Sequence, residues 1–171
     1  MPLIVASFSA TADCANYGMV IGTYVDVKSN NVSYAIAKEK LQANKKAMGA
    51  SAYKQTLQFL ATAYEIIPPN TSAVDASKIA WESCKKQAKG DSPSDLCFGS
   101  AYSTGWAATE RNRGRSLESL RKEMLTTDTF ANLVLDQALA LAYTQRNVAP
   151  WDLQQRQFLN CKQNLKSLSR E

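Results

Sequence analysis

The sequence contains no histidine, and this absence removes both the commonest general base and the commonest metal-binding side chain of proteins. A Gly-x-Ser-x-Gly nucleophile motif is also missing. No stretch approaches the roughly 20 consecutive apolar residues that a membrane-spanning helix needs. The chain has no basic motif rich in aromatic residues, which disfavours nucleic-acid binding. We therefore expect no catalytic residues, no metal, no cofactor, no nucleic-acid partner and no membrane insertion.

What the chain does contain is typical of a globular protein. Of its 171 residues, 45% are apolar and 20% are charged, which separates it from disordered chains. This length can bury a substantial core, either as one domain or as two small ones.

One stretch is repeated within the chain. Gln58–Tyr64 returns as Gln137–Tyr143 with five of seven positions identical. A cysteine pair brackets each copy, and after each opening cysteine a glycine and then a serine follow at equal distances: Gly22 and Ser33 in the first copy, Gly105 and Ser116 in the second. We interpret this pattern as a tandem duplication with module 1 at residues 13–89, a linker at 90–95 and module 2 at 96–171.

The cysteines favour disulfide bonds over a metal site. Their number is even, and their spacing lacks the close pairs that zinc binding requires. Cys14–Cys84 and Cys97–Cys161 are the pairings that fit inside the two modules, although four cysteines allow three connectivities. Disulfides indicate an oxidising compartment, so we predict a periplasmic or secreted protein.

Residues 1–12 resemble the end of a secretory signal. A short apolar run leads to Ala10-Thr11-Ala12, a small-x-small sequence of the kind that signal peptidase accepts, and cleavage would leave Asp13 first. No basic residue precedes the run. A truncated signal segment and a plain apolar first segment are both compatible with this pattern.

Hydrophobic periodicity predicts four helices in each module and hence an all-α fold. In module 1 we expect helices at 14–28, after Ser33, at about 51–66 and at about 73–88. In module 2 we expect them from Cys97, after Ser116, at about 129–145 and from Pro150. The overall prediction is two similar four-helix modules, each closed by one disulfide, with both closing cysteines on buried helix faces.

The sharpest charged feature is a basic run, Arg111, Arg113 and Arg115, followed by Arg121. Guanidinium groups bind planar anions in a bidentate manner, so these four residues are the candidate binding site for an acidic partner. A solvated turn between helices, with Gly114 at the bend, is the structural alternative. The net charge of +5 by itself is common among soluble proteins.

Two further sets of side chains suit other functions. A pair of carboxylates could support glycoside hydrolysis, although charged residues on helix faces usually meet solvent; the candidates are Glu110, Glu118, Glu123, Asp128 and Asp136. Aromatic residues could line a ligand pocket, although helical spacing is more typical of core packing; these are Tyr17, Tyr24, Tyr102, Trp106 and Trp151.

The second module also resembles known sequences. Its Cys97, Gly105, Ala142-Tyr143, Pro150 and Phe158-Leu159-x-Cys161 are similar to small helical domains of exported bacterial proteins. Cys97 with Tyr102-x-x-Gly105 is similar to the opening of the Rap1a/Tai immunity proteins, periplasmic partners that neutralise type VI secretion effectors. This resemblance implies a periplasmic setting and a role through binding.

Taken together, these patterns favour a non-enzymatic periplasmic or secreted binding protein that acts through contact with another protein. An immunity or inhibitor role against a secreted effector is the alternative among binding proteins. A cell-envelope hydrolase that uses carboxylates is the alternative among enzymes.

Overall fold

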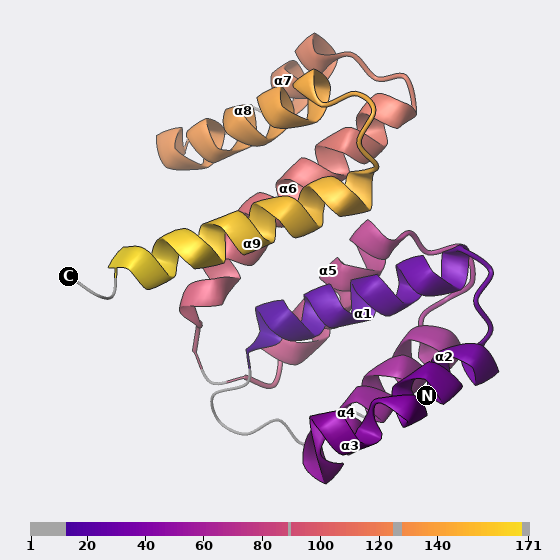
Figure 1. The fold of residues 1–171 in the computed structure, drawn as a ribbon. Helices are drawn as coiled ribbons and strands as arrows, with labels where there is room; N and C mark the ends of the chain where they lie inside the picture. The colour runs from indigo at the N-terminus through magenta and orange to yellow at the C-terminus, as the bar shows by residue number, and fades with distance from the viewer. Residues whose placement is uncertain (1–12, 89, 125–127, 169–171) are drawn as a thin grey trace. The chain divides into compact units, whose positions relative to one another are not determined.

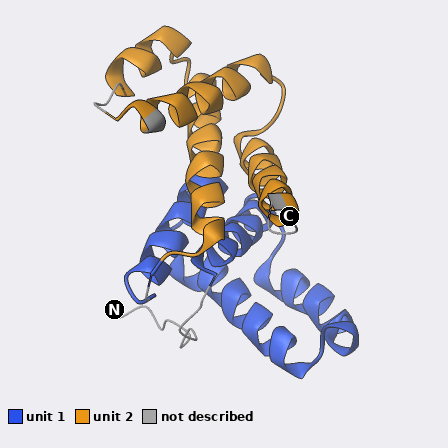
Figure 2. Ribbon diagram, turned by 90° about the vertical axis from the view of Figure 1, so that its left-hand side faces the viewer, with its two compact units in different colours: residues 1–90 blue, residues 91–171 orange. Residues whose placement is uncertain are grey.

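A computed structural model describes residues 13–88, 90–124 and 128–168 of the chain. The predicted signal segment at 1–12 therefore lies outside the described residues. Every regular element in the described part is helical, which confirms the all-α prediction (Figure 1). The chain divides into two compact units: unit 1 ends at Gly90, and unit 2 is Asp91–Glu171 (Figure 2).

Unit 1 is built around two long helices and a helical hairpin. Helix α1 (Cys14–Ser29) packs along α5 (Ala73–Lys85), and α2 (Tyr34–Ala43), the single turn α3 (Lys45–Met48) and α4 (Ala50–Ala61) form the hairpin (Figure 1). Helix α4 continues as a π-helical turn, η1 (Thr62–Ile66), before Pro68 and Pro69. The predicted helix at 51–66 is thus one continuous element with a change of winding.

Local sequence explains where these helices begin. Asp13 accepts a hydrogen bond from the Asn16 N–H (3.0 Å), and Ser33 accepts one from the Ile36 N–H (3.3 Å). Ser72 caps α5 in the same manner. Between α3 and α4, Gly49 has a φ of 80°, a backbone conformation that residues with a Cβ rarely adopt, and it ends α3 directly before α4 begins.

Unit 2 contains four helices among its described residues. Helix α6 (Pro93–Asn112) lies between α8 (Thr129–Thr144) and α9 (Pro150–Leu168), and α7 (Leu117–Met124) packs on α8. Helix α6 begins at Pro93 with a capping box between Ser92 and Asp95, so the second half of the expected linker belongs to its first turn.

Each unit has its own apolar core. In unit 1 the core joins α1, η1 and α5 through the buried residues Ile21, Val25, Ala63, Ile67, Ala76 and Ala80. In unit 2 it joins α6, α7, α8 and α9 through Ala107, Ala108, Leu120, Leu139, Ala142 and Leu153. Small residues on the central helices allow close helix packing in both units.

Both predicted disulfides are confirmed. Cys14–Cys84 joins α1 to α5, and Cys97–Cys161 joins α6 to α9, each with Cα atoms 5.5 Å apart. Each bond therefore links the first and last helices of one unit. The expectation that both closing cysteines are buried is wrong for Cys161, which is only partly buried because the exposed polar residues Asn160 and Gln163 flank it; Cys84 is 1% exposed.

Candidate functional site

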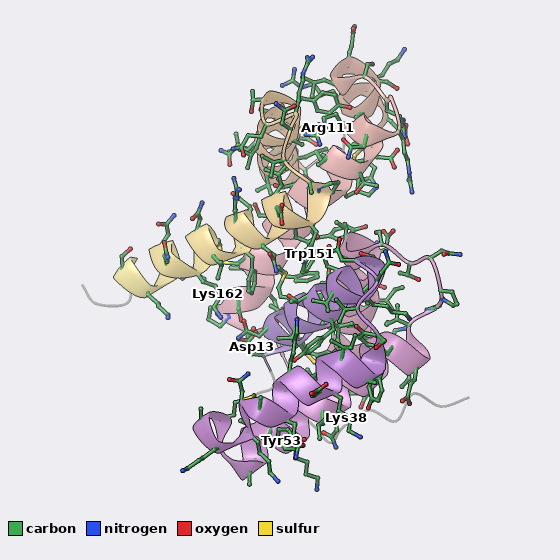
Figure 3. All side chains as sticks on the ribbon, turned by 45° about the vertical axis from the view of Figure 1, so that its right-hand side comes forward. Asp13, Lys38, Tyr53, Arg111, Trp151 and Lys162 are labelled. Atoms are coloured by element: carbon green, nitrogen blue, oxygen red, sulfur yellow. A yellow bond between two sulfur atoms is a disulfide. The ribbon has the colours of Figure 1, made fainter. Side chains whose placement is uncertain are left out.

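Arg111, the first residue of the predicted basic site, connects α6 to the end of α8 and to the turn before α9. Its guanidinium donates hydrogen bonds to the carbonyls of Ala142 (2.5 Å) and Gln145 (2.9 Å) at the end of α8. A further bond reaches the carbonyl of Val148 (3.1 Å), just before α9. Partial burial lowers the pKa of the Arg111 guanidinium from its ordinary value. The side chain thus fastens the α8–α9 turn to α6 (Figure 3).

Arg113 and Arg115 both pair with Glu110, a carboxylate of α6 that is 6% exposed. The nitrogen–oxygen distances are 2.6 Å and 3.3 Å. Arg115 also donates a hydrogen bond to Glu123 of α7, and that bond is the main reason why the pKa of its guanidinium is raised. Burial of Glu110 is tolerable because two guanidinium groups compensate its charge.

Arg121, the last residue of the predicted site, pairs with Asp136 of α8 at 2.9 Å, and both side chains are about half exposed. All four candidate arginines therefore contact groups of unit 2 itself. The same contacts occupy three of the carboxylates considered for hydrolysis: Glu110, Glu123 and Asp136. This geometry favours the structural alternative over an anion-binding turn.

Unit 1 has a counterpart of Arg111. Lys28 lies near the end of α1, as Arg111 does in α6, and its Nζ donates to the carbonyls of Ala63 (3.4 Å) and Tyr64 (3.1 Å). Ala63 and Ala142 are equivalent positions of the repeated stretch. A cation near the end of the first helix therefore anchors a later helix in both units: Lys28 of α1 anchors η1, and Arg111 of α6 anchors α8.

Three of the aromatic candidates, Tyr17, Tyr24 and Trp106, pack within their own units. Tyr17 lies against Phe59 with ring centroids 5.1 Å apart, and Tyr24 packs on the core of unit 1. Trp106 packs on the core of unit 2, and Trp151 is 5% exposed. These contacts favour core packing over a ligand pocket, as their helical spacing indicated.

The hairpin of unit 1 carries a concentration of exposed positive charge. We call Tyr34–Ala61, which comprises α2, α3 and α4, the lysine hairpin. All of its residues are described, and it contains five exposed lysines, Lys38, Lys40, Lys45, Lys46 and Lys54, against one acidic residue, Glu39. It thus carries four of the five net positive charges of the chain.

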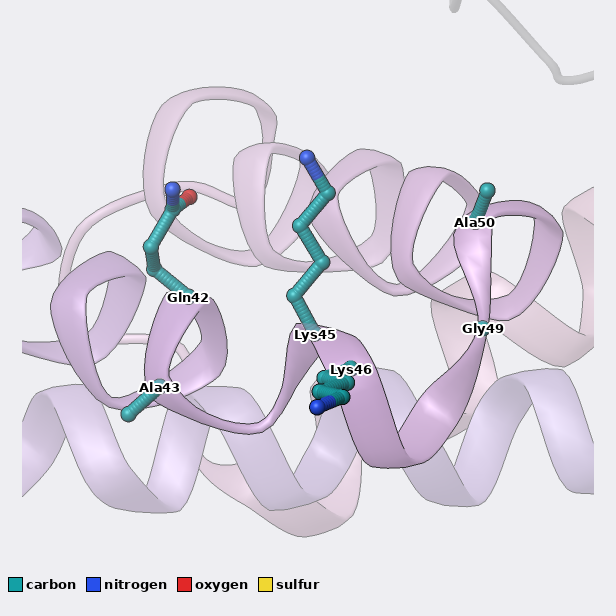
Figure 4. A pocket seen from close by; sticks show the side chains of 6 residues that line it. All are labelled: Gln42, Ala43, Lys45, Lys46, Gly49 and Ala50. Atoms are coloured by element: carbon teal, nitrogen blue, oxygen red, sulfur yellow. The ribbon is translucent and has the colours of Figure 1, made fainter.

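A shallow pocket of about 490 Å³ lies at the tip of the lysine hairpin (Figure 4). Figure 4 shows the side chains of Gln42 and Lys45 extending to the same side of the hairpin, whereas Lys46 points toward the viewer. The other residues lining the pocket are Ala43, Gly49 and Ala50. Its walls therefore combine two ammonium groups with small apolar side chains.

Tyr53 contacts two of the side chains that line this pocket, Gln42 and Lys45. It is 9% exposed, its hydroxyl hydrogen-bonds to the Gln42 side chain, and the Lys45 ammonium lies 5.3 Å from its ring centroid. Sequence reasoning missed this surface because it weighed the net charge over the whole chain. The available signal was the absence of acidic residues between Lys40 and Tyr64.

Neither metal-binding clusters nor similar proteins point to a second site. Within the described ranges, no three cysteine or carboxylate side chains are placed to hold a metal ion. No helix in those ranges has both the length and the apolar character to cross a bilayer. Comparison with protein families, curated proteins and solved structures gave no match to this chain. The similarity to the Rap1a/Tai proteins stays a prediction.

Proposed function

We propose that this chain is a non-enzymatic binding protein of the periplasm or the extracellular space, which acts through contact with another protein. We further propose that its two helical units arose by tandem duplication. The observation that carries the binding function is a contrast between two basic segments: the four candidate arginines of unit 2 bond to groups of their own unit, whereas the lysines of the hairpin in unit 1 face solvent.

The proposed duplication is supported by contacts that recur at equivalent positions, in addition to the disulfides. The turn after the first helix contains a residue with positive φ in each unit, Asn31 (62°) and Gly114 (84°). Two residues later a serine hydroxyl accepts a hydrogen bond from a backbone N–H of the next helix: Ser33 from Ile36, and Ser116 from Ser119. These contacts lie at the same distances from the opening cysteine of each unit, which supports the proposed duplication.

Export is supported by the chemistry of the cysteines. All four are paired, each pair joins the terminal helices of one unit, and no free thiol is present. Bonds of this kind form and persist in oxidising compartments, whereas the cytosol keeps thiols reduced. The binding role is therefore assigned to the periplasm or to the medium.

The lysine hairpin supports a role through surface contact, because its five exposed lysines repel one another within the fold and attract acidic groups of other molecules. In unit 2, Arg113, Arg115 and Arg121 are compensated by pairing with Glu110, Glu123 and Asp136. Among the described residues, no carboxylate lies within ion-pair distance of the five hairpin lysines. Their field thus remains available to attract and orient a partner.

The proposal is tested by affinity capture with the oxidised protein as bait from the exported fraction of its source. We expect one protein to be enriched and then to form a stoichiometric complex with the purified chain in size-exclusion chromatography. The matched control is bait with both disulfides reduced and alkylated, which should lose the complex. Failure to retain any protein, together with turnover of cell-envelope glycan by the purified chain, would replace binding with the hydrolase alternative.

A further inference from the structure

The lysine hairpin combines three properties that define a docking surface: concentrated charge of one sign, lack of internal compensation and a fixed local geometry. We infer that it binds an acidic segment of a partner protein, with Asp or Glu side chains facing Lys45 and Lys46 at the pocket and the other hairpin lysines around it. This inference rests on the proposed function and names the surface and the partner chemistry for it.

Charge complementarity is the first argument. The hairpin has a net charge of +4 and the whole chain +5, so the rest of the chain is nearly neutral. A second copy of the chain therefore offers no matching excess of negative charge. The complementary surface must belong to another molecule, and its acidic groups would be steered to the hairpin by long-range attraction.

The pocket is arranged before a partner arrives. The buried Tyr53 holds Gln42 by a hydrogen bond and lies beneath the Lys45 ammonium, so the two side chains lose less freedom on binding than free lysines and glutamines would. Figure 3 labels Lys38 on α2 and Tyr53 on α4, the two long helices of the hairpin. The tip thus offers a shallow recess bordered by Lys45 and Lys46, in which Tyr53 holds Gln42 and Lys45 in place.

The composition of the hairpin favours protein carboxylates over phosphate polymers and lipids. It contains no arginine, the residue that grips phosphates in a bidentate manner, and none of its aromatic rings is fully exposed for base stacking. An interfacial membrane helix presents a broad apolar face, whereas Tyr53 and Leu60 of the hairpin are buried and Ile36 is 48% exposed. A lysine ammonium is a compact point charge, so separate lysines can each pair with one carboxylate of an acidic segment.

The test measures binding of a fluorescein-labelled decaglutamate peptide to the oxidised full chain by fluorescence anisotropy at low salt. Lys45→Glu with Lys46→Glu should weaken binding by about tenfold or more, because each reversal replaces attraction with repulsion. Lys38→Glu with Lys46→Glu changes two exposed lysines of the hairpin and leaves the Lys45–Tyr53 contact in place. This second variant should weaken binding similarly if the first one is unstable. Circular dichroism checks that each variant folds.

Lys86→Glu with Lys122→Glu is the matched control, because it alters the net charge by the same amount at exposed sites outside the hairpin. We expect this variant to bind the peptide within about twofold of the parent. Equal losses in the hairpin variant and the control would overturn the inference, since the net charge alone would then explain binding. Preferential, hairpin-dependent binding to anionic phospholipid vesicles or to single-stranded DNA would overturn it too.

The captured partner separates this inference from the proposed function. If the partner complex survives Lys45→Glu with Lys46→Glu unchanged, the binding function stands and the lysine hairpin is not its docking surface. If the complex is lost in this variant and kept in the Lys86→Glu with Lys122→Glu control, the binding function and the docking surface are both supported. Absence of any partner overturns the proposed function, whatever the peptide does.

Discussion

Tyr64 and Tyr143 make the same hydrogen bond in different units. The Tyr64 hydroxyl donates to the carbonyl of Val32 (2.8 Å), and the Tyr143 hydroxyl donates to the carbonyl of Arg115. Each carbonyl directly precedes the serine that caps the second helix of its unit. The last residue of the repeated stretch therefore joins η1 to the loop before α2 in unit 1, and α8 to the loop before α7 in unit 2.

Removing either hydroxyl should destabilise the protein measurably. Tyr64→Phe and Tyr143→Phe each leave a carbonyl without its donor, and we expect each to lower the free energy of unfolding by about 1 kcal/mol in urea titrations. Tyr34→Phe is the control, because its ring lies 5.6 Å from that of Tyr64 while no hydrogen bond of its hydroxyl is found among the described residues. Losses no larger than in this control would contradict a structural role for the hydroxyls.

Alkaline pH should weaken the fold through the tyrosines. Burial is the largest cause that raises the pKa values of Tyr17, Tyr24, Tyr64 and Tyr143 above the ordinary value of 10.0. The folded state thus holds these protons more tightly than the unfolded state, so the stabilisation is complete below the unfolded pKa and is lost as the pH rises through the folded pKa.

Urea titrations at about pH 8, 9, 10 and 11 check this dependence. We expect the free energy of unfolding to be steady at first and to fall above about pH 10. The double variant Tyr64→Phe with Tyr143→Phe should show a shallower fall, since two of the four groups no longer titrate. A fall of equal depth in the variant would show that other groups cause the alkaline loss.

The sequence was most informative where both units repeat the same local signal. Cys14 and Ser33 recur in register as Cys97 and Ser116, and the stretch that ends at Tyr64 returns at Tyr143, so disulfide pairings and helix starts could be predicted from spacing. These features depend on residues a few positions apart or on the repetition itself.

The partners of the arginines could not be predicted in this way. Arg111 bonds to carbonyls 31 to 37 residues away, and every residue type offers such a carbonyl, so no side-chain pattern marks them. Its position among alternating charges predicts a solvated Glu110, yet the fold buries this carboxylate and pairs it with Arg113 and Arg115. The exposure of the hairpin lysines likewise depends on which carboxylates the fold brings near them.

Arg111→Met should lower the stability of the protein. Methionine keeps most of the apolar stem but leaves the carbonyls of Ala142, Gln145 and Val148 without their guanidinium donor. We expect a loss of about 1–3 kcal/mol in the free energy of unfolding. Arg156→Met, at an exposed site on α9, should change it by less than about 0.5 kcal/mol. Equal effects at both sites would contradict the anchoring role of Arg111.

Each disulfide should contribute about 4 kcal/mol to stability, because the bonds close loops of similar length. The sequence separations are 70 residues for Cys14–Cys84 and 64 residues for Cys97–Cys161. Loop-closure entropy varies only with the logarithm of length, so the double serine variants of the two pairs should lose nearly equal free energy in urea titrations. A difference above about 1 kcal/mol would show that loop closure is not the dominant contribution.

Gly105 and Gly99 of α6 provide a matched pair for the helix contact in unit 2. A Cβ at Gly105 would lie 2.9 Å from the Gln154 Cβ and 3.2 Å from the Pro150 carbonyl oxygen, whereas a Cβ at Gly99 would meet nothing within 4 Å. Gly105→Ala should therefore force α6 and α9 apart at a cost of about 1–3 kcal/mol. This cost exceeds the helix-propensity gain of about 0.5–1 kcal/mol that alanine brings.

Gly99→Ala gains the same helix propensity without the clash, so the two substitutions should change the melting temperature in opposite directions. Differential scanning calorimetry of both variants with the Cys97–Cys161 bond intact measures the signs directly. Because the chemical change is identical, only the surroundings of the new methyl group can produce a difference. Stabilisation by both substitutions would mean that α9 does not approach α6 at Gly105 as closely as described here, and that the Gly105–Gln154 contact does not set the packing of these helices.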